Sequence, residues 1–253
     1  MANTVLVNSK FTKDVFLKTF PLLPDPIVLY PSVRSYGNCD RYPIPTLVSI
    51  NRFERKKNIE LALLAFSKLK RDFPGAKCII AGGYDKRVSE NIIYHKELQH
   101  LCSSLSLKHA TIVRNEKHMI EEWNDVDVKF LLSFDSERKR ELLTKSWVLA
   151  YTPENEHFGI VPLEAMSHEL PVVSVNSGGP KETIVDGSTG FLIESSGDNS
   201  KDSALFASKL LILLQSKDAS VDMGKNGKIH VSNNFAFTFF SKRLCSILEK
   251  KDK

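Results

Sequence analysis

Short apolar runs alternate with amphipathic segments along most of the chain. The strand-like runs lie at residues 47–50, 78–81, 111–113, 128–134, 147–151, 171–175 and 190–193. Helical spacing separates most of them, as at 58–71, where apolar residues recur at 59, 62, 63, 66 and 69. Short β-rich runs separated by helices are typical of a mainly parallel sheet covered on both faces. The pattern therefore predicts a doubly wound α/β domain over about residues 46–230.

The first 45 residues do not continue this alternation. Residues 4–8 predict a strand, 11–20 a helix and 27–30 a short extended piece, with prolines between them. One strand and one helix cannot bury their own apolar faces, and a lone parallel strand has no partner. We expect residues 1–45 to be a remnant of a preceding α/β domain with its linker, and residues 46–253 to be a single domain with C-terminal helices.

The last sixty residues predict helices, with an apolar stripe formed by Leu205, Leu210, Leu211 and Leu214. A phenylalanine-rich stretch follows at 235–240. Three interpretations stay open for this stretch: a helix packed on the domain, a seat for another domain, or a weak contact with a membrane surface. Packing within or between domains is favoured.

Composition narrows the class of protein only mildly. The chain has 253 residues, of which 42% are hydrophobic and 26% charged, and a formal net charge of +5 that is spread along the chain. This charge does not indicate a nucleic-acid partner. Its four cysteines form no regular framework, Cys78 lies in an apolar run that predicts burial, and no N-x-Ser/Thr site or long apolar span occurs. These features predict a soluble domain in a reducing, cytosolic environment.

Two glutamates frame the stretch with the most chemical information. Glu156 lies in the loop after the run ending at Tyr151, and Glu164 lies eight positions later inside a predicted helix. In a parallel sheet, ligands bind beyond the carboxyl ends of the strands, which is where this loop falls. Gly159 allows close backbone approach, and the free amides of the helix start favour an anion. Helix capping is an alternative explanation for Glu156, but it leaves Glu164 within an apolar run unexplained.

This stretch, E-H-F-G-I-V-P-L-E-A-M at residues 156–166, resembles the Glu–seven residues–Glu signature of retaining GT-B glycosyltransferases that use nucleotide sugars. Further matches lie at residues 7–12, 29–31, 49–58, 81–85, 151–153 and 175–182. Together they resemble most the dolichol-pathway mannosyltransferases that form α-1,3 and α-1,6 linkages. The resemblance implies a GT-B C-terminal Rossmann-like domain whose activity is transfer of mannose from GDP-mannose, with retention, to a dolichol-linked oligosaccharide during N-glycan precursor assembly.

The resemblance also implies roles for particular residues. Arg52 and Lys57 match the basic pair that holds the diphosphate, and cations are otherwise disfavoured at a helix start. Glu156 matches the residue that contacts the transferred sugar, and Glu164 the one that holds the ribose hydroxyls. The backbone amides of Phe158, Gly159 and Ile160 are expected to face the sugar and the diphosphate. Gly82 and Gly83 either let the backbone approach the nucleotide or simply close a tight strand–helix turn.

No cofactor or metal is expected, because the fold that the chain resembles needs none. Asp125 and Asp127 imitate a metal-binding D-x-D pair without other ligands nearby. The expected partners are GDP-mannose, the dolichol-linked acceptor, the cytosolic face of the endoplasmic reticulum membrane and other mannosyltransferases of the pathway, with no nucleic acid.

Two departures from the family pattern change the expectation for this polypeptide. Most of the acceptor-binding domain has no counterpart in the sequence, so we expect the chain alone to bind the donor weakly and to transfer mannose poorly or not at all. A non-catalytic nucleotide-sugar-binding module is therefore the alternative. The second departure is an apparent surface insertion at about residues 114–127.

Overall fold

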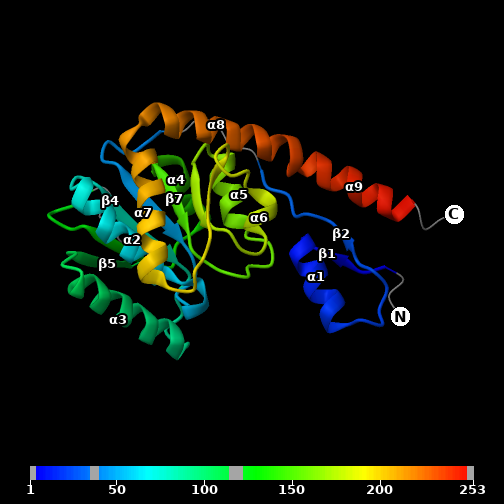
Figure 1. The fold of residues 1–253 in the computed structure, drawn as a ribbon, viewed down its shortest axis with the longest axis horizontal. Helices are drawn as coiled ribbons and strands as arrows, with labels where there is room; N and C mark the ends of the chain where they lie inside the picture. Colours follow the sequence, from blue (N-terminus) through cyan, green and yellow to red (C-terminus); the bar gives the residue numbers. More distant parts are fainter. Residues whose placement is uncertain (1–3, 35–39, 114–121, 250–253) are drawn as a thin grey trace.

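A seven-stranded parallel sheet forms the centre of the protein (Figure 1). The structure, a computed structural model, describes residues 4–34, 40–113 and 122–249. The strands of this sheet are β3 (Thr46–Ile50), β4 (Lys77–Gly82), β5 (His109–Val113), β6 (Val128–Leu132), β7 (Val148–Tyr151), β8 (Val172–Val175) and β9 (Gly190–Ile193). Their order is β5-β6-β4-β3-β7-β8-β9. From β3 the sheet grows toward β4 on one side and toward β7 on the other, so the order in which strands are added reverses at β3. The predicted doubly wound α/β fold is confirmed.

Helices cover both faces of this sheet (Figure 1). One face carries α2 (Ile59–Asp72), α3 (Ser89–Ser104) and α7 (Asn199–Gln215). The other carries α4 (Ser136–Lys145), α5 (Ile160–Ser167), the short α6 (Pro180–Thr183) and α8 (Lys217–Asn234). A 3₁₀ turn, η1 (Arg55–Lys57), joins β3 to α2. Each face has its own apolar core, as expected for a sheet buried on both sides.

The apolar pattern in the sequence predicted the buried residues of α2 correctly and those of α7 only in part. In α2 the five predicted positions are all buried, and Cys78 in β4 is buried as predicted. In α7 the predicted stripe is wrong at Leu205, which is 55% exposed, while Phe206 and Leu210 are buried. Five residues at 100° each place Leu205 about 140° around the helix from Leu210, outside the buried face.

The N-terminal segment, residues 4–34, has a small sheet of its own. It contains β1 (Leu6–Val7), α1 (Lys10–Thr19) and β2 (Ile27–Val28), and β1 pairs in parallel with β2. The expectation that the first strand lacks a partner is therefore wrong. The chain returns after α1 and places Ile27 beside Leu6, so the strand is paired from within the segment. The proposed domain division at residue 45 stays a prediction.

The phenylalanine-rich stretch joins the two regions. Figure 1 shows α8 and α9 (Phe237–Glu249) running nearly end to end from the domain toward the N-terminal segment. Phe235, between them, is buried, and its ring centre lies 5.7 Å from that of Tyr30 and 6.4 Å from that of Phe158. Phe237 and Phe239 are 65% and 50% exposed. Within the described residues, no helix is long and apolar enough to cross a membrane.

The predicted insertion is only partly visible. Residues 114–121 lie outside the described part of the chain. In the described remainder, Trp123 is 9% exposed, and the Lys129 Nζ lies 4.4 Å from the centre of its ring. The expected surface excursion is therefore wrong for Trp123, because the amphipathic lysine stem and the ring cover each other.

Candidate functional site

A cavity of about 440 Å³ opens at the carboxyl ends of β3, β4 and β7. Arg52 lies beyond the end of β3, Gly82 ends β4 and Gly83 follows it, and Tyr151 ends β7. The cavity thus lies where the strand order reverses, which is the usual ligand-binding position in an open parallel sheet. The predicted site residues that line it are Arg52, Lys57, Gly82, Gly83, Glu156, Phe158, Gly159 and Ile160.

Lys57 and Glu156 form an ion pair in this cavity. The Lys57 side chain is 12% exposed and that of Glu156 is 24% exposed. The Thr152 hydroxyl donates to the Lys57 carbonyl at 2.8 Å, and the Tyr151 hydroxyl donates to Glu156 Oε2 at 3.4 Å. Burial, and then the nearby Glu156 carboxylate, raise the pKa of Tyr151 well above its usual value, so this hydroxyl stays a donor. A cation and a carboxylate are therefore held together beside an open space.

The second cation of the predicted basic pair is held differently. The Arg52 guanidinium contacts Glu54 Oε1 at 2.9 Å, and its side chain is 61% exposed. An ion pair this exposed contributes little free energy, because water screens it. Arg52 can therefore leave Glu54 for an anionic ligand in the cavity at small cost.

Gly159 shapes the entrance to α5. It precedes the first residue of the helix with φ 72°, a backbone conformation that favours glycine. Pro162 lies in the first turn of α5, as predicted. The N–H groups of this turn have no acceptor within the helix, and Ile160 lines the cavity. The N–H groups of this first turn are therefore suited to bind a negatively charged group of a ligand.

The two glycines that end β4 have different reasons to be glycine. A Cβ atom on Gly82 would lie 1.7 Å from the Asn51 carbonyl oxygen, because the ends of β3 and β4 meet there. A Cβ atom on Gly83 would lie 3.5 Å from Arg52 Cγ, an ordinary contact. Packing between strands thus explains Gly82, although both glycines border the cavity.

Glu164 is the predicted site residue that this cavity does not include. Its carboxylate lies 2.5 Å from Lys139 Nζ, on α4, and its side chain is 24% exposed. The sequence left a carboxylate in an apolar run unexplained, and Lys139 supplies the missing partner. The contact of Glu164 with a ribose stays a prediction.

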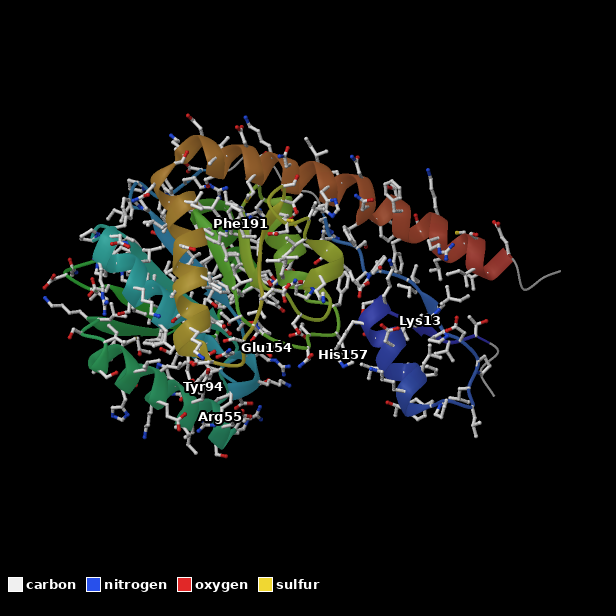
Figure 2. The ribbon with its side chains drawn as sticks, in the orientation of Figure 1. Lys13, Arg55, Tyr94, Glu154, His157 and Phe191 are labelled. Atoms are coloured by element: carbon white, nitrogen blue, oxygen red, sulfur yellow. The ribbon has the colours of Figure 1, made fainter. Side chains whose placement is uncertain are left out.

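Sequence reasoning gave no role to the N-terminal residues that border the same cavity. Asn8 and Pro31 line it together with His157. The Ser9 hydroxyl donates to the His157 carbonyl, and Thr12 Oγ1 lies 2.9 Å from His157 Nδ1 (Figure 2 labels His157, at the end of the domain that faces α1). The family-like run at residues 7–12 was the one sequence signal for this part of the site. It could not show the contact between Thr12 and His157, because the two residues lie 145 positions apart.

Both aspartates of the D-x-D pair form ion pairs with lysines. Asp125 contacts Lys108, and the Asp127 carboxylate lies 2.8 Å from Lys70 Nζ. In the part of the chain that the structure describes, no group of three or more His, Cys, Asp or Glu side chains is placed to hold a metal ion.

The fold and the cavity define the class of protein, a GT-B glycosyltransferase domain. The family model described as "Glycosyl transferases group 1" matches residues 43–230, and the chain belongs to this family. The sucrose-phosphate synthase from Thermosynechococcus elongatus superposes with a TM-score of 0.79 at 19% identity, over 99% of this chain and 58% of that one. Anabaena HepE in complex with UDP-glucose superposes with a TM-score of 0.76 at 20% identity, over 99% and 64%.

Curated relatives narrow the similarity further. The chain is 45% identical over 209 residues to "Alpha-1,3/1,6-mannosyltransferase ALG2" of Kluyveromyces lactis, covering 74% of this chain and 41% of the relative. It is 37% identical over 268 residues to the human protein of the same name, covering 99% and 59%. The chain thus spans about half the length of the curated relatives it matches. The resemblance found in the sequence motifs is confirmed.

Proposed function

We propose that the chain is the donor-binding part of a mannosyltransferase that transfers mannose from GDP-mannose to a dolichol-diphosphate-linked oligosaccharide. The linkage formed is α-1,3, α-1,6 or both, with retention, during N-glycan precursor assembly. Relatives named as α-1,3/1,6-mannosyltransferases support this proposal. The single observation that carries it is the Lys57–Glu156 pair, set in a cavity at the reversal of strand order. These relatives favour an enzyme over a non-catalytic binding module.

Each charged group in the cavity has a task in donor binding. Lys57 and Arg52 neutralise the diphosphate, Lys57 as a point charge and Arg52 through a two-pronged guanidinium. The first-turn amides of α5 add further donors to the same anion. Glu156 accepts hydrogen bonds from mannose hydroxyls. Glu164 lies outside this cavity, and it takes the ribose hydroxyls after its ion pair with Lys139 breaks.

We expect the transfer step to take place on the face of mannose that carries the diphosphate. The bond between C1 of mannose and the diphosphate oxygen breaks, and the acceptor hydroxyl oxygen bonds to C1 from the same face. The hydroxyl proton moves to the departing phosphate oxygen, so the configuration at C1 is retained. Lys57 and Arg52 stabilise the negative charge that grows on the leaving group. Because side-chain cations do this work, we expect donor binding without an added metal.

The dolichol-linked acceptor determines where in the cell the domain would act. A dolichol-linked glycan lies in a membrane, so we propose that the domain works at the cytosolic face of the endoplasmic reticulum membrane beside other mannosyltransferases of the pathway. Support comes from the names of the curated relatives alone. We assign donor binding to the residues described above, and it is the part of the proposal to test on this chain.

Calorimetric titration of the purified chain tests the donor assignment. The chain, checked for folding by circular dichroism, is titrated with GDP and then GDP-mannose in the presence of EDTA, with UDP-glucose as the control. Saturable binding of both guanine nucleotides, at least tenfold tighter than that of UDP-glucose, is the expected result (about 1.4 kcal/mol). Equal affinity for UDP-glucose, or no binding by the folded chain, would refute GDP-mannose as the donor of this domain.

A further inference from the structure

Glu182, on α6, makes three hydrogen bonds to the N-terminal segment. Its two carboxylate oxygens accept from the backbone N–H of Lys10, at 2.9 Å, and of Phe11, at 2.8 Å. The Tyr30 hydroxyl donates to it at 2.7 Å. These donors lie 152 to 172 residues away in sequence, so one side chain ties the segment to the domain.

The start of α1 needs this carboxylate. The first N–H groups of a helix lack intrahelical acceptors and carry partial positive charge. The first turn of α1 contains Lys10 and Lys13 and no acidic residue, so its own side chains worsen the local charge. Ser9 accepts from the Thr12 N–H at 2.8 Å, and Glu182 accepts from the two N–H groups before it. The negative charge that this helix start favours is thus supplied from the domain.

The helix held in this way holds a cavity residue in turn. The hydroxyls of Ser9 and Thr12 both donate to the His157 carbonyl, the second at 3.3 Å. Thr12 Oγ1 also contacts His157 Nδ1, and the Phe11 ring lies edge-on to the imidazole with 5.6 Å between ring centres. His157 follows Glu156 directly, and both line the cavity. Movement of α1 therefore moves the backbone that carries the Glu156 carboxylate.

The opposite side of the same loop is held by the turn that leads into α6. The Gly179 N–H donates to the Glu156 carbonyl at 2.7 Å. A Cβ atom on Gly178 would lie 2.3 Å from the Glu156 carbonyl oxygen, and one on Gly179 would lie 2.2 Å from that of Phe158. The β7–α5 loop, residues 152–159, is thus enclosed between this turn and α1, and Glu182 connects the two sides.

We propose that Glu182 is a positioning residue for the cavity: it fixes the start of α1, and α1 fixes the β7–α5 loop so that Glu156 meets Lys57. Glu182 does not line the cavity and acts through α1 and His157. Its consequence for donor affinity rests on the proposed function, whereas its consequence for the loop does not.

Hydrogen–deuterium exchange of the purified chain tests the placement without any ligand. Glu182→Gln keeps the size of the side chain and removes its charge. We expect amide exchange to rise on the order of tenfold in residues 9–20 and about threefold in residues 154–160, with α2 unchanged. Glu97→Gln is the matched control, because Glu97 is a carboxylate that accepts hydrogen bonds from Arg55 and lies on α3, and it does not line the cavity. It should leave both segments unchanged.

A second variant separates positioning from general support. Thr12→Val keeps the side-chain shape and removes the hydroxyl that bonds to His157, so exchange should rise at 154–160 but much less at 9–20. Because both changes act on one path, the double variant should raise exchange at 154–160 by less than the product of the two single effects. A full product, or unchanged exchange at 154–160 in Glu182→Gln, would overturn the proposal.

Donor affinity extends the test to function. GDP-mannose binding should weaken about threefold to tenfold in both Glu182→Gln and Thr12→Val, and not in Glu97→Gln. If the unaltered chain binds no GDP-mannose, the proposed donor is wrong, and the exchange data still decide the role of Glu182. If it binds and both variants bind equally well, the loop is positioned without Glu182.

Discussion

The seven-stranded domain and the N-terminal segment both line the cavity, but they are held in different ways. In the domain, α2 buries seven side chains against the sheet. In the segment, α1, all of which is described, buries none. Its place depends on hydrogen bonds to Glu182 and His157. One wall of the cavity is therefore fixed by an apolar core, whereas α1 in the other wall is fixed mainly by polar contacts, so α1 should open at lower free energy.

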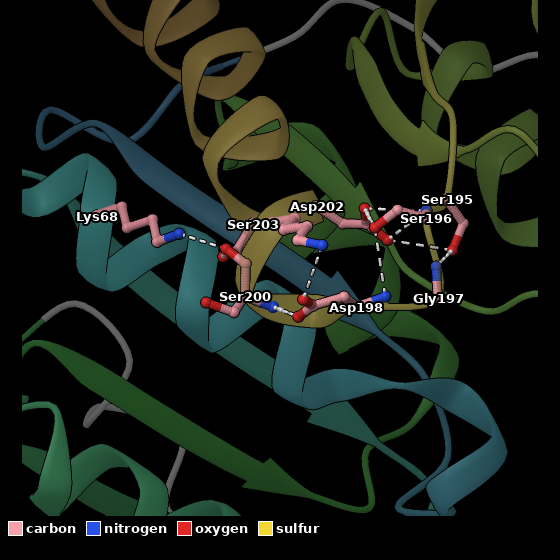
Figure 3. Close-up of polar contacts among 9 residues, drawn as sticks. Lys68, Ser195, Ser196, Gly197, Asp198, Ser200, Asp202 and Ser203 are labelled. Carbon is pink, nitrogen blue, oxygen red and sulfur yellow. Dashed lines mark hydrogen bonds and ion pairs between the residues drawn. The ribbon is translucent and has the colours of Figure 1, made fainter.

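The first turns of two helices show the same contrast. Figure 3 shows the start of α7, where Asp198 accepts from the Ser200 N–H and Asp202 accepts from the Ser196 N–H and hydroxyl. In each of these capping bonds the donor and acceptor lie within six residues of each other. The start of α1 is served by Glu182, 171 residues from Phe11. A local cap forms with its helix, whereas a remote cap requires the whole domain to be folded first.

Removal of Asp202 should give the largest loss of stability. The carboxylate is 3% exposed and accepts hydrogen bonds from Ser195 and Ser196, which Asp202→Ala leaves unpaired. We expect the free energy of unfolding of the domain to fall by about 2 kcal/mol, measured by urea denaturation. Asp218→Ala, at the first turn of α8, is the control and should change it little. Equal losses in both would mean that the local cap of α7 has no special role.

The same carboxylate should make stability depend on acid. Burial favours the protonated form, but hydrogen bonds from Ser196 and Ser195 outweigh it, and the pKa of Asp202 is lowered. A lowered folded-state pKa stabilises the fold above the unfolded-state value of about 3.9, and this contribution is lost as the pH falls further. The stability difference between the unaltered chain and Asp202→Asn should therefore shrink from pH 6 to pH 3. A constant difference would contradict the lowered pKa.

Local signals in the sequence account for what could be predicted. Periodicity predicts the strands at 46–50 and 190–193 and the buried face of α2. In each case the apolar residues that give the signal belong to the same short stretch of chain that forms the strand or helix. The motif resemblance pointed to Lys57 and Glu156, and the structure brings them together. Periodicity cannot show that Lys139 pairs with Glu164, because that contact depends on how two helices pack side by side.

The pairing of β1 with β2 was equally hidden from the sequence. It depends on how the chain returns after α1, and no residue in the two-residue strands specifies that return. The Glu182 contact depends on the placement of a whole region against the domain. What the sequence could not predict is therefore concentrated in the wall of the cavity that polar contacts hold.

Lys57→Ala tests the wall that the domain supplies. We expect GDP-mannose binding to weaken at least tenfold, about 1.4 kcal/mol, because the diphosphate loses its most enclosed cation. Lys56→Ala is the matched control, since its side chain is 66% exposed and does not line the cavity. It should bind the donor as the unaltered chain does. Equal affinities in the two variants, by calorimetry, would remove the assignment of Lys57 to the diphosphate.

Ser9→Ala tests the wall that the segment supplies. Loss of a helix-capping hydroxyl typically costs about 1 kcal/mol, and here the same hydroxyl also bonds to His157. We expect faster amide exchange over residues 9–20, with the urea midpoint of the domain unchanged. A lower midpoint would show that the segment unfolds together with the domain, and the contrast between the two walls would fail.

Tyr30→Phe should have the smallest effect and sharpen the contrast most. The change removes one of the three donors to Glu182 and leaves the ring packed against Phe158 and Phe235. Burial and the bond to Glu182 raise the pKa of Tyr30, so the hydroxyl stays protonated and donates at neutral pH. We expect a cost of about 0.5–1 kcal/mol, seen as twofold to fivefold faster exchange near residues 9–12. An effect as large as that of Glu182→Gln would mean that the tyrosine, rather than the start of α1, is the main partner of this carboxylate.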